Sequence, residues 1–213
     1  MIKALLTTLL LSFTAISHAT VITFEDWQYN SGYQIDWRVS IDDESNDGFF
    51  TFNIGIGTAN PTGDILGFAF DTTADFDIPA DLVNYSTYDF SNYTTDSLSC
   101  GPGCNFNGAT RYNFDNLFKV GDQGSGGDYV TLFSFGLAKG DLILDETLFT
   151  RVAIRAQSVG YDCDTNNCNG SVKDISEDPT VQPPVSVPEP STAMLLGLAL
   201  LGICARSRKR QSI

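Results

Sequence analysis

Histidine is almost absent from this chain of 213 residues, because His18 is the only one. It falls within the first 19 residues, which have a short charged start, an almost wholly apolar run from Ala4 to Ile16 and small residues up to Ala19. This layout is typical of a secretory signal peptide, and we expect cleavage between Ala19 and Thr20. The mature chain would then contain no histidine. That excludes Ser-His-Asp and Cys-His catalytic arrangements and the usual zinc ligands.

Basic side chains are scarce as well. The chain has 12 Lys+Arg against 26 Asp+Glu, a formal net charge of −14. Between residues 20 and 187 there are 7 basic and 25 acidic residues, a net charge of −18. Such a surface repels nucleic acid and anionic lipid, so we expect no nucleic-acid partner. Glycosidase chemistry needs only a pair of carboxyl groups and stays open, although the order of the acidic residues selects no pair.

Cysteine is limited to five residues, and four of them lie between residues 20 and 187. Cys100 and Cys104 enclose Gly-Pro-Gly, and Cys163 and Cys168 enclose Asp-Thr-Asn-Asn. In an exported domain such a set indicates disulfides. We favour the two local pairs because the enclosed residues bend tightly, while cross-pairing would close a longer loop and stabilise the domain more. A zinc site is disfavoured, because histidine is missing and the compartment is oxidising.

A weak calcium motif overlaps the second cysteine pair. Asp162, Asp164 and Asn166 place oxygen ligands at alternate residues, as at the start of a calcium-binding loop. The sixth position is Asn167 rather than glycine, and the twelfth is Lys173 rather than a bidentate glutamate. The favoured interpretation is therefore a disulfide-linked turn. Ca²⁺ is a weak candidate ligand, and no other cofactor is expected.

The body of the chain alternates apolar and polar side chains with the period of a β-strand. Residues 33–41 and 50–56 show the pattern most clearly, because every second side chain is apolar. We expect an all-β fold, a single antiparallel β-sandwich resembling a jelly roll, over residues 20–175. Residues 71–108 fit worst and are expected to form a long loop that carries Cys100 and Cys104. Further strands are expected at Val21–Glu25, Ile65–Phe70, Arg111–Phe118, Tyr129–Leu137 and Leu148–Val159.

Three features follow one another at the end of the chain. Residues 176–187 are rich in proline and predict an extended spacer. Pro188, Glu189 and Pro190 come next, before an apolar run over 192–205 that is 14 residues long, about 21 Å as a helix. This run is a marginal single transmembrane helix, since a bilayer core needs roughly 20 residues. A basic cluster that should stay cytoplasmic ends the segment: Arg206, Arg208, Lys209 and Arg210.

The tail VPEPSTAMLLGLALLGICARSRKR resembles the C-terminal sorting signal of PEP-CTERM proteins, which are exported by Gram-negative bacteria that make extracellular polysaccharide. The resemblance implies that Pro188, Glu189 and Pro190 are the motif recognised by an exosortase, a membrane-embedded transpeptidase-like enzyme. It also implies that residues 188–213 anchor the chain in the membrane only until processing. We therefore expect export, transient anchoring, and a final location at the cell surface or outside the cell. An ordinary tail helix that stays in the membrane is the alternative.

These features favour a non-enzymatic exported protein of the cell surface or of the exopolysaccharide matrix. A carbohydrate-binding module is the first alternative, and a carboxylate-based glycan hydrolase is the second. Aromatic rings would supply sugar contacts in either case. The aromatic residues of the first strands are expected mainly in the core: Trp27, Tyr29, Tyr33 and Trp37. We favour as sugar contacts three tyrosines outside the clear strands: Tyr85, Tyr88 and Tyr93.

Overall fold

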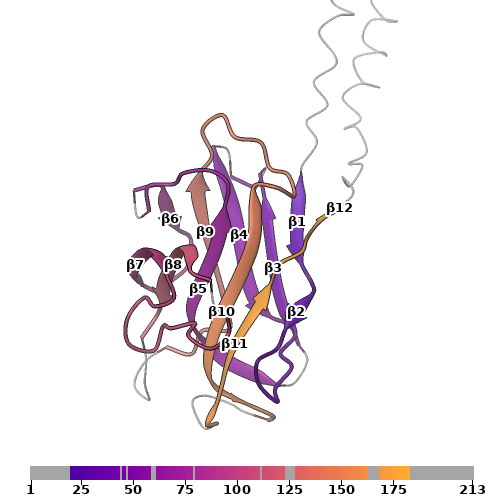
Figure 1. Cartoon of the computed structure of the whole chain (residues 1–213), viewed down its shortest axis with the longest axis vertical. Helices are drawn as coiled ribbons and strands as arrows, with labels where there is room; N and C mark the ends of the chain where they lie inside the picture. Colours follow the sequence, from indigo (N-terminus) through magenta and orange to yellow (C-terminus); the bar gives the residue numbers. More distant parts are fainter. Residues whose placement is uncertain are drawn as a thin grey trace, which may run out of the picture.

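A computed structural model describes residues 20–182 with the exception of 44, 47, 59–60, 79, 111, 123–127 and 163–167. This part of the chain folds into two antiparallel sheets that face each other as a sandwich (Figure 1). The expected all-β sandwich is thus confirmed. Among the described residues, no helix has the length and apolar character needed to cross a membrane. The expected signal peptide, the sorting motif, the apolar run and the basic cluster lie outside them.

The first sheet, sheet A, has the strand order β12-β1-β3-β4-β9-β6. Its central strands alternate buried apolar residues with polar or small ones, which places one face on the core and the other toward solvent. In chain order its strands are β1 (Val21–Phe24), β3 (Trp37–Asp42), β4 (Phe49–Ile56), β6 (Leu82–Asn84), β9 (Leu132–Ala138) and β12 (Pro179–Gln182).

The second sheet, sheet B, has the order β2-β11-β10-β5-β8-β7. Its long central strands are buried on both faces, because sheet A covers one face and a loop covers the other. In chain order its strands are β2 (Trp27–Gln28), β5 (Thr62–Thr72), β7 (Phe90–Ser97), β8 (Phe114–Val120), β10 (Phe149–Gly160) and β11 (Gly170–Ser176).

Phenylalanine fills the space between the two sheets. Phe52 of sheet A stacks on Phe135 at a centroid distance of 4.4 Å and meets Phe149 of sheet B edge-on at 5.0 Å. Phe68 contacts Phe133 edge-on at 5.9 Å across the same gap. Edge-on and offset pairs of this kind add to the free energy gained by burying the rings. The core is therefore continuous between the sheets, and the outer face of sheet A is left for other roles.

A second, smaller core lies on the outer face of sheet B. The described residues of segment 98–113 fold back over this face, where Phe106 packs against Phe114 with ring centroids 5.5 Å apart. Cys100 and Cys104 are buried in the same cluster and form a disulfide, with their Cα atoms 5.1 Å apart. The last part of residues 71–108, which were expected to form a long loop, belongs to this segment. The same region also contains β6 and β7, which the sequence pattern did not predict.

The folded domain extends further than expected at its C-terminal end. β12 lies inside the expected spacer of residues 176–187, yet it pairs antiparallel with all four residues of β1. Pro179 is tolerated there because β12 is the edge strand of sheet A, where one side needs no partner. The boundary expected at residue 175 is therefore too early, since the sheet continues to Gln182.

Candidate functional site

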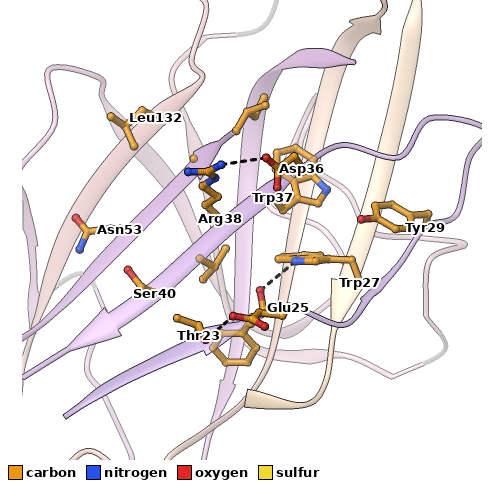
Figure 2. A pocket seen from close by; sticks show the side chains of 14 residues that line it. Thr23, Glu25, Trp27, Tyr29, Asp36, Trp37, Arg38, Ser40, Asn53 and Leu132 are labelled. Atoms are coloured by element: carbon orange, nitrogen blue, oxygen red, sulfur yellow. Dashed lines mark hydrogen bonds and ion pairs between the residues drawn. The ribbon is translucent and has the colours of Figure 1, made fainter. Parts of the chain in front are cut away.

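A groove with a volume of about 540 Å³ lies over the outer face of sheet A. Strands β1, β3, β4 and β9 supply its floor, and the loop from Glu25 to Asp36 supplies one wall. Figure 2 shows the aromatic residues of this wall on one side and Leu132, Asn53 and Ser40 on the other. The groove brings aromatic rings and exposed polar side chains together, so it is the candidate functional site.

Cross-strand register brings the floor residues together. Thr23 is opposite Ser40, and Ser40 is in turn opposite Asn53, which places two hydroxyls and an amide in one row across three strands. Gly55 is opposite Leu132 in the neighbouring row. Because a sheet exposes every second residue, these side chains share the solvent face while their chain neighbours enter the core. The floor of the groove therefore consists mainly of short polar side chains.

Gly55 contributes to the depth of the groove because it has no side chain. A Cβ atom at this position would lie 2.9 Å from Cδ1 of Leu132, which is 66% exposed at the edge of the groove. A larger residue would push the leucine side chain aside and fill the space between β4 and β9. The missing side chain thus maintains the depth of the groove.

Two aromatic rings form the wall. Trp27, on β2, is half-buried against Trp37 with ring centroids 6.1 Å apart, and its Nε1 donates to the carbonyl oxygen of Phe24 over 3.1 Å. Tyr29 is 38% exposed and its hydroxyl donates to the carbonyl oxygen of Ile35 over 3.3 Å. Each ring is held by a hydrogen bond at its polar end. The rings are therefore fixed in place next to the floor.

The loop that carries these rings is fastened to sheet B by a buried carboxylate. Asp174 of β11 accepts a hydrogen bond from Nε1 of Trp37 at 2.8 Å and one from the backbone N–H of Asn30 at 3.3 Å. Burial raises the pKa of Asp174, while these two hydrogen bonds act in the opposite direction. Burial also raises the pKa of the Tyr29 hydroxyl, with the carboxylates of Asp174 and Asp36 adding to the shift. The phenol of Tyr29 is thus kept as a neutral hydrogen-bonding group.

Charged groups lie on the rim. Nη2 of Arg38 is 3.3 Å from Oδ2 of Asp36, and the side chains are 67% and 40% exposed. Gly57 makes room for this pair, because a Cβ atom there would overlap the Asp36 carboxylate. Glu25 accepts a hydrogen bond from the hydroxyl of Thr23 at 3.3 Å. The rim thus has one cation whose charge is compensated, and two carboxylates from different parts of the loop.

The arrangement suits binding of a polar, extended ligand. The groove offers hydroxyl and amide groups that both donate and accept, flanked by fixed aromatic rings. No cluster of three or more His, Cys, Asp or Glu side chains able to hold a metal occurs among the described residues. Of the weak calcium candidates, Asp162 is described, in a backbone conformation with φ of 54°. Asp164 and Asn166 lie outside the described residues.

The cysteine prediction is supported where the structure describes it. Cys100 and Cys104 form the first expected local pair. Cys168 is also disulfide-bonded, and its expected partner Cys163 lies outside the described residues. At the expected cleavage site, Ala19 is outside the described residues as well. The backbone N–H of Thr20 donates to Oδ1 of Asp43 over 3.0 Å, so the sandwich begins directly at this position.

The aromatic residues are placed differently from the expectation. Tyr88 and Tyr93 pack partly buried against the main core, and Tyr93 contacts Phe118 with centroids 5.9 Å apart. Tyr85 is 37% exposed but covers Gly136 rather than the groove. The aromatic residues of the groove wall are instead Trp27 and Tyr29, which the strand pattern placed mainly in the core. The sequence signal that could have found them is the break in alternation between β1 and β3.

Comparison with known proteins identifies the end of the chain. Residues 186–209 match the family model of the PEP-CTERM protein-sorting motif. The match contains the Pro-Glu-Pro motif, the apolar run and most of the basic cluster predicted from the sequence. Neither a curated protein nor a solved structure matches the chain. The chain therefore carries a C-terminal sorting signal, which indicates export, processing by an exosortase and transient membrane anchoring through this region.

Proposed function

We propose that this exported protein, the bearer of a PEP-CTERM sorting motif, is a non-enzymatic component of the cell surface or of the extracellular polysaccharide matrix. The observation that carries the proposal is the position of the motif, which begins at residue 186 directly after a sandwich whose last strand ends at Gln182. A folded acidic domain is thus joined to a sorting signal by only a few residues. The signal supplies the location, and the domain supplies the surface that contacts the matrix.

The negative net charge of the chain supports an extracellular role, because it favours solubility of the domain. The chain has a formal net charge of −14, which resists self-association and adsorption to anionic lipid. Among the described residues, the buried carboxylates of Asp64 and Asp174 accept hydrogen bonds from backbone and side-chain donors. Their role in this proposal is to hold loops on the sandwich.

The sorting part of the proposal is tested by deleting residues 188–213 and by a second variant, Pro188→Ala with Glu189→Ala. Both are expressed, beside the full chain, in a Gram-negative host that makes an exosortase and exopolysaccharide. We expect the full chain in the surface and matrix fractions as a shortened form, and enzymatic removal of the polysaccharide should release it. The deletion variant should appear in the medium with an unchanged fold by circular dichroism. Identical distribution of all three proteins would refute the proposal.

A glycan hydrolase is the second candidate, because Glu25 and Asp36, at the two ends of the loop, both line the groove. However, Asp36 forms an ion pair with Arg38, and Glu25 accepts a hydrogen bond from the Thr23 hydroxyl. We expect no release of reducing ends when the protein is incubated with polysaccharide from the producing host. Release that disappears in both Glu25→Gln and Asp36→Asn would favour the hydrolase instead.

A further inference from the structure

We propose that the groove on sheet A binds a chain of neutral sugar residues, with Trp27 and Tyr29 as the stacking surface and the floor as the hydrogen-bonding surface. The inference rests on the proposed function, since it names the ligand class that would attach the protein to the matrix. The inference concerns only the groove. If the groove binds no sugar, the proposed location of the protein is not affected.

The aromatic wall fits the apolar face of a sugar ring. Sugar rings present C–H groups on one face and hydroxyls around the edge, and the C–H face packs on aromatic rings. The polar ends of Trp27 and Tyr29 are occupied by the carbonyl oxygens of Phe24 and Ile35. What each ring offers a ligand is therefore its apolar surface. Because the rings are already fixed, little side-chain entropy is lost on binding.

The floor fits the hydroxyl edge. Thr23, Ser40 and Asn53 come from three adjacent strands, which are spaced about 4.8 Å apart in a sheet. Ser40 and Asn53 can both donate and accept hydrogen bonds, as sugar hydroxyls do, whereas the Thr23 hydroxyl already donates to Glu25 and accepts from the Gln182 amide. The row runs across the strands, so a chain lying along it would meet one polar group per strand. An extended polymer fits this row better than a compact ligand.

The charge on the rim selects for a neutral chain. Glu25 and Asp36 are both acidic, and the only basic group in the groove lining, Arg38, is paired with Asp36. With a chain charge of −14, a polyuronate would meet like charge both locally and at long range. A peptide strand is disfavoured too, because peptides add to a free sheet edge. The floor consists of strands paired on both sides, since β1, β3, β4 and β9 are all internal in sheet A.

The chain carries its own reporter of binding. Its two tryptophans, Trp27 and Trp37, both line the groove, so intrinsic fluorescence responds to the occupant. The full chain in mild detergent is titrated with hydroxyethylcellulose, a neutral β-glucan, with a galactomannan, also neutral, and with alginate, which is anionic. Three variants are compared with the unchanged protein. Asn53→Arg places a long side chain on the floor, Trp27→Ala removes the main ring, and Tyr112→Ala removes a tyrosine that is 75% exposed elsewhere.

We expect a fluorescence change with at least one neutral polymer and none with alginate. Asn53→Arg should weaken binding about tenfold or more while keeping both tryptophans and the melting temperature, because Asn53 is exposed. Trp27→Ala should also weaken binding about tenfold or more, measured by calorimetry because this variant loses one of the two tryptophans, and Tyr112→Ala should bind like the unchanged protein. Equal affinity of Asn53→Arg and the unchanged protein would overturn the inference. So would preference for alginate, or no binding of either neutral polymer at millimolar sugar concentration. If the full chain still occupies the matrix in that case, the groove proposal alone has failed.

Discussion

Asp174 and Trp37 join the two sheets of the sandwich through a buried hydrogen bond. The indole Nε1 of Trp37, on β3, donates to Oδ2 of Asp174, on β11, over 2.8 Å. The other carboxylate oxygen accepts the backbone N–H of Asn30 at 3.3 Å. One side chain therefore holds both the buried ring beneath the groove and the loop that carries Tyr29. The groove wall depends on sheet B even though the floor belongs to sheet A.

Replacing Asp174 with alanine should destabilise the domain markedly. The variant leaves the buried indole N–H and the Asn30 N–H without an acceptor, which costs about 2–4 kcal/mol in the free energy of unfolding. Urea unfolding measures this loss. Asp174→Asn retains one acceptor oxygen and should lose less. A double-mutant cycle with Trp37→Phe should give a coupling energy of about 1–2 kcal/mol. Additive effects of the two substitutions would show that the hydrogen bond contributes nothing.

Asp174 also illustrates which strands the sequence could not predict. Residues 33–41 and 50–56 were predicted as strands because their alternate positions are uniformly apolar. β4 covers the second range, whereas β3 begins only at Trp37. In β11, the inward positions are Val172, Asp174 and Ser176, so the apolar alternation is lost although all three residues are buried. In a sequence, a buried carboxylate cannot be distinguished from a surface carboxylate unless its hydrogen-bond partner is known. That partner, Trp37, is 137 residues away in the sequence.

Other parts of the structure escaped prediction for related reasons. In β7, Asn92 and Asp96 have positive φ values of 52° and 46°, and the register shifts between Ser91 and Thr94, so no period of two persists. The groove floor is made by the opposition of Thr23, Ser40 and Asn53, which only the strand register establishes. The sorting signal was predictable because its motif, its apolar run and its basic cluster follow one another directly in the sequence.

Asp64 should make stability depend on pH. It is fully buried, and burial raises its pKa from the ordinary value of 3.8 to about 6, although the Val130 N–H and Gln157 amide donate to it. The folded state then holds a proton that the unfolded state releases. This group's contribution is fully present below about pH 4 and is lost as pH rises through about 6, by up to about 3 kcal/mol.

The test of this pH dependence is Asp64→Asn, which does not titrate and keeps an acceptor for the Val130 N–H. Urea unfolding at a series of pH values should show the variant gaining about 2–3 kcal/mol relative to the unchanged protein between pH 4 and pH 7. A constant difference across this range would mean that Asp64 has the same pKa in the folded and unfolded states.

Gly67→Ala should disturb the second core. A Cβ atom at this position would lie 2.7 Å from Sγ of Cys104, and that sulfur cannot move away because it is buried and bonded to Cys100. We expect a loss of about 1–3 kcal/mol in thermal or chemical unfolding. Gly32→Ala is the control, since no heavy atom lies within 4 Å of its added Cβ. Equal melting temperatures for the two variants would mean that segment 98–113 does not dock on sheet B.

Arg151 should be the cation on which the domain's stability depends most. Its Nε lies 2.5 Å from Oδ2 of Asp71, its Nη2 donates to the carbonyl oxygen of Asn113 over 2.6 Å, and its guanidinium is 4.1 Å from the ring centre of Phe114. The Arg151 side chain is only 9% exposed. Arg151→Ala therefore leaves Oδ2 of Asp71 and the Asn113 carbonyl oxygen without this donor, while Oδ1 of Asp71 keeps the backbone N–H of Asp115. The expected loss is about 3 kcal/mol or more.

Arg38→Ala is the matched control for Arg151, because the Arg38–Asp36 pair is well exposed and should contribute about 0–1 kcal/mol. Arg151→Lys separates charge from geometry. The lysine keeps the positive charge but cannot reach Asp71 and Asn113 together, so it should recover only part of the loss. High salt should screen the Arg38 pair and leave the Arg151 pair nearly unchanged. If Arg151→Ala unfolds at the same urea concentration as Arg38→Ala, then the disulfide and the Phe106–Phe114 contact must hold segment 98–113 on sheet B without help from this arginine.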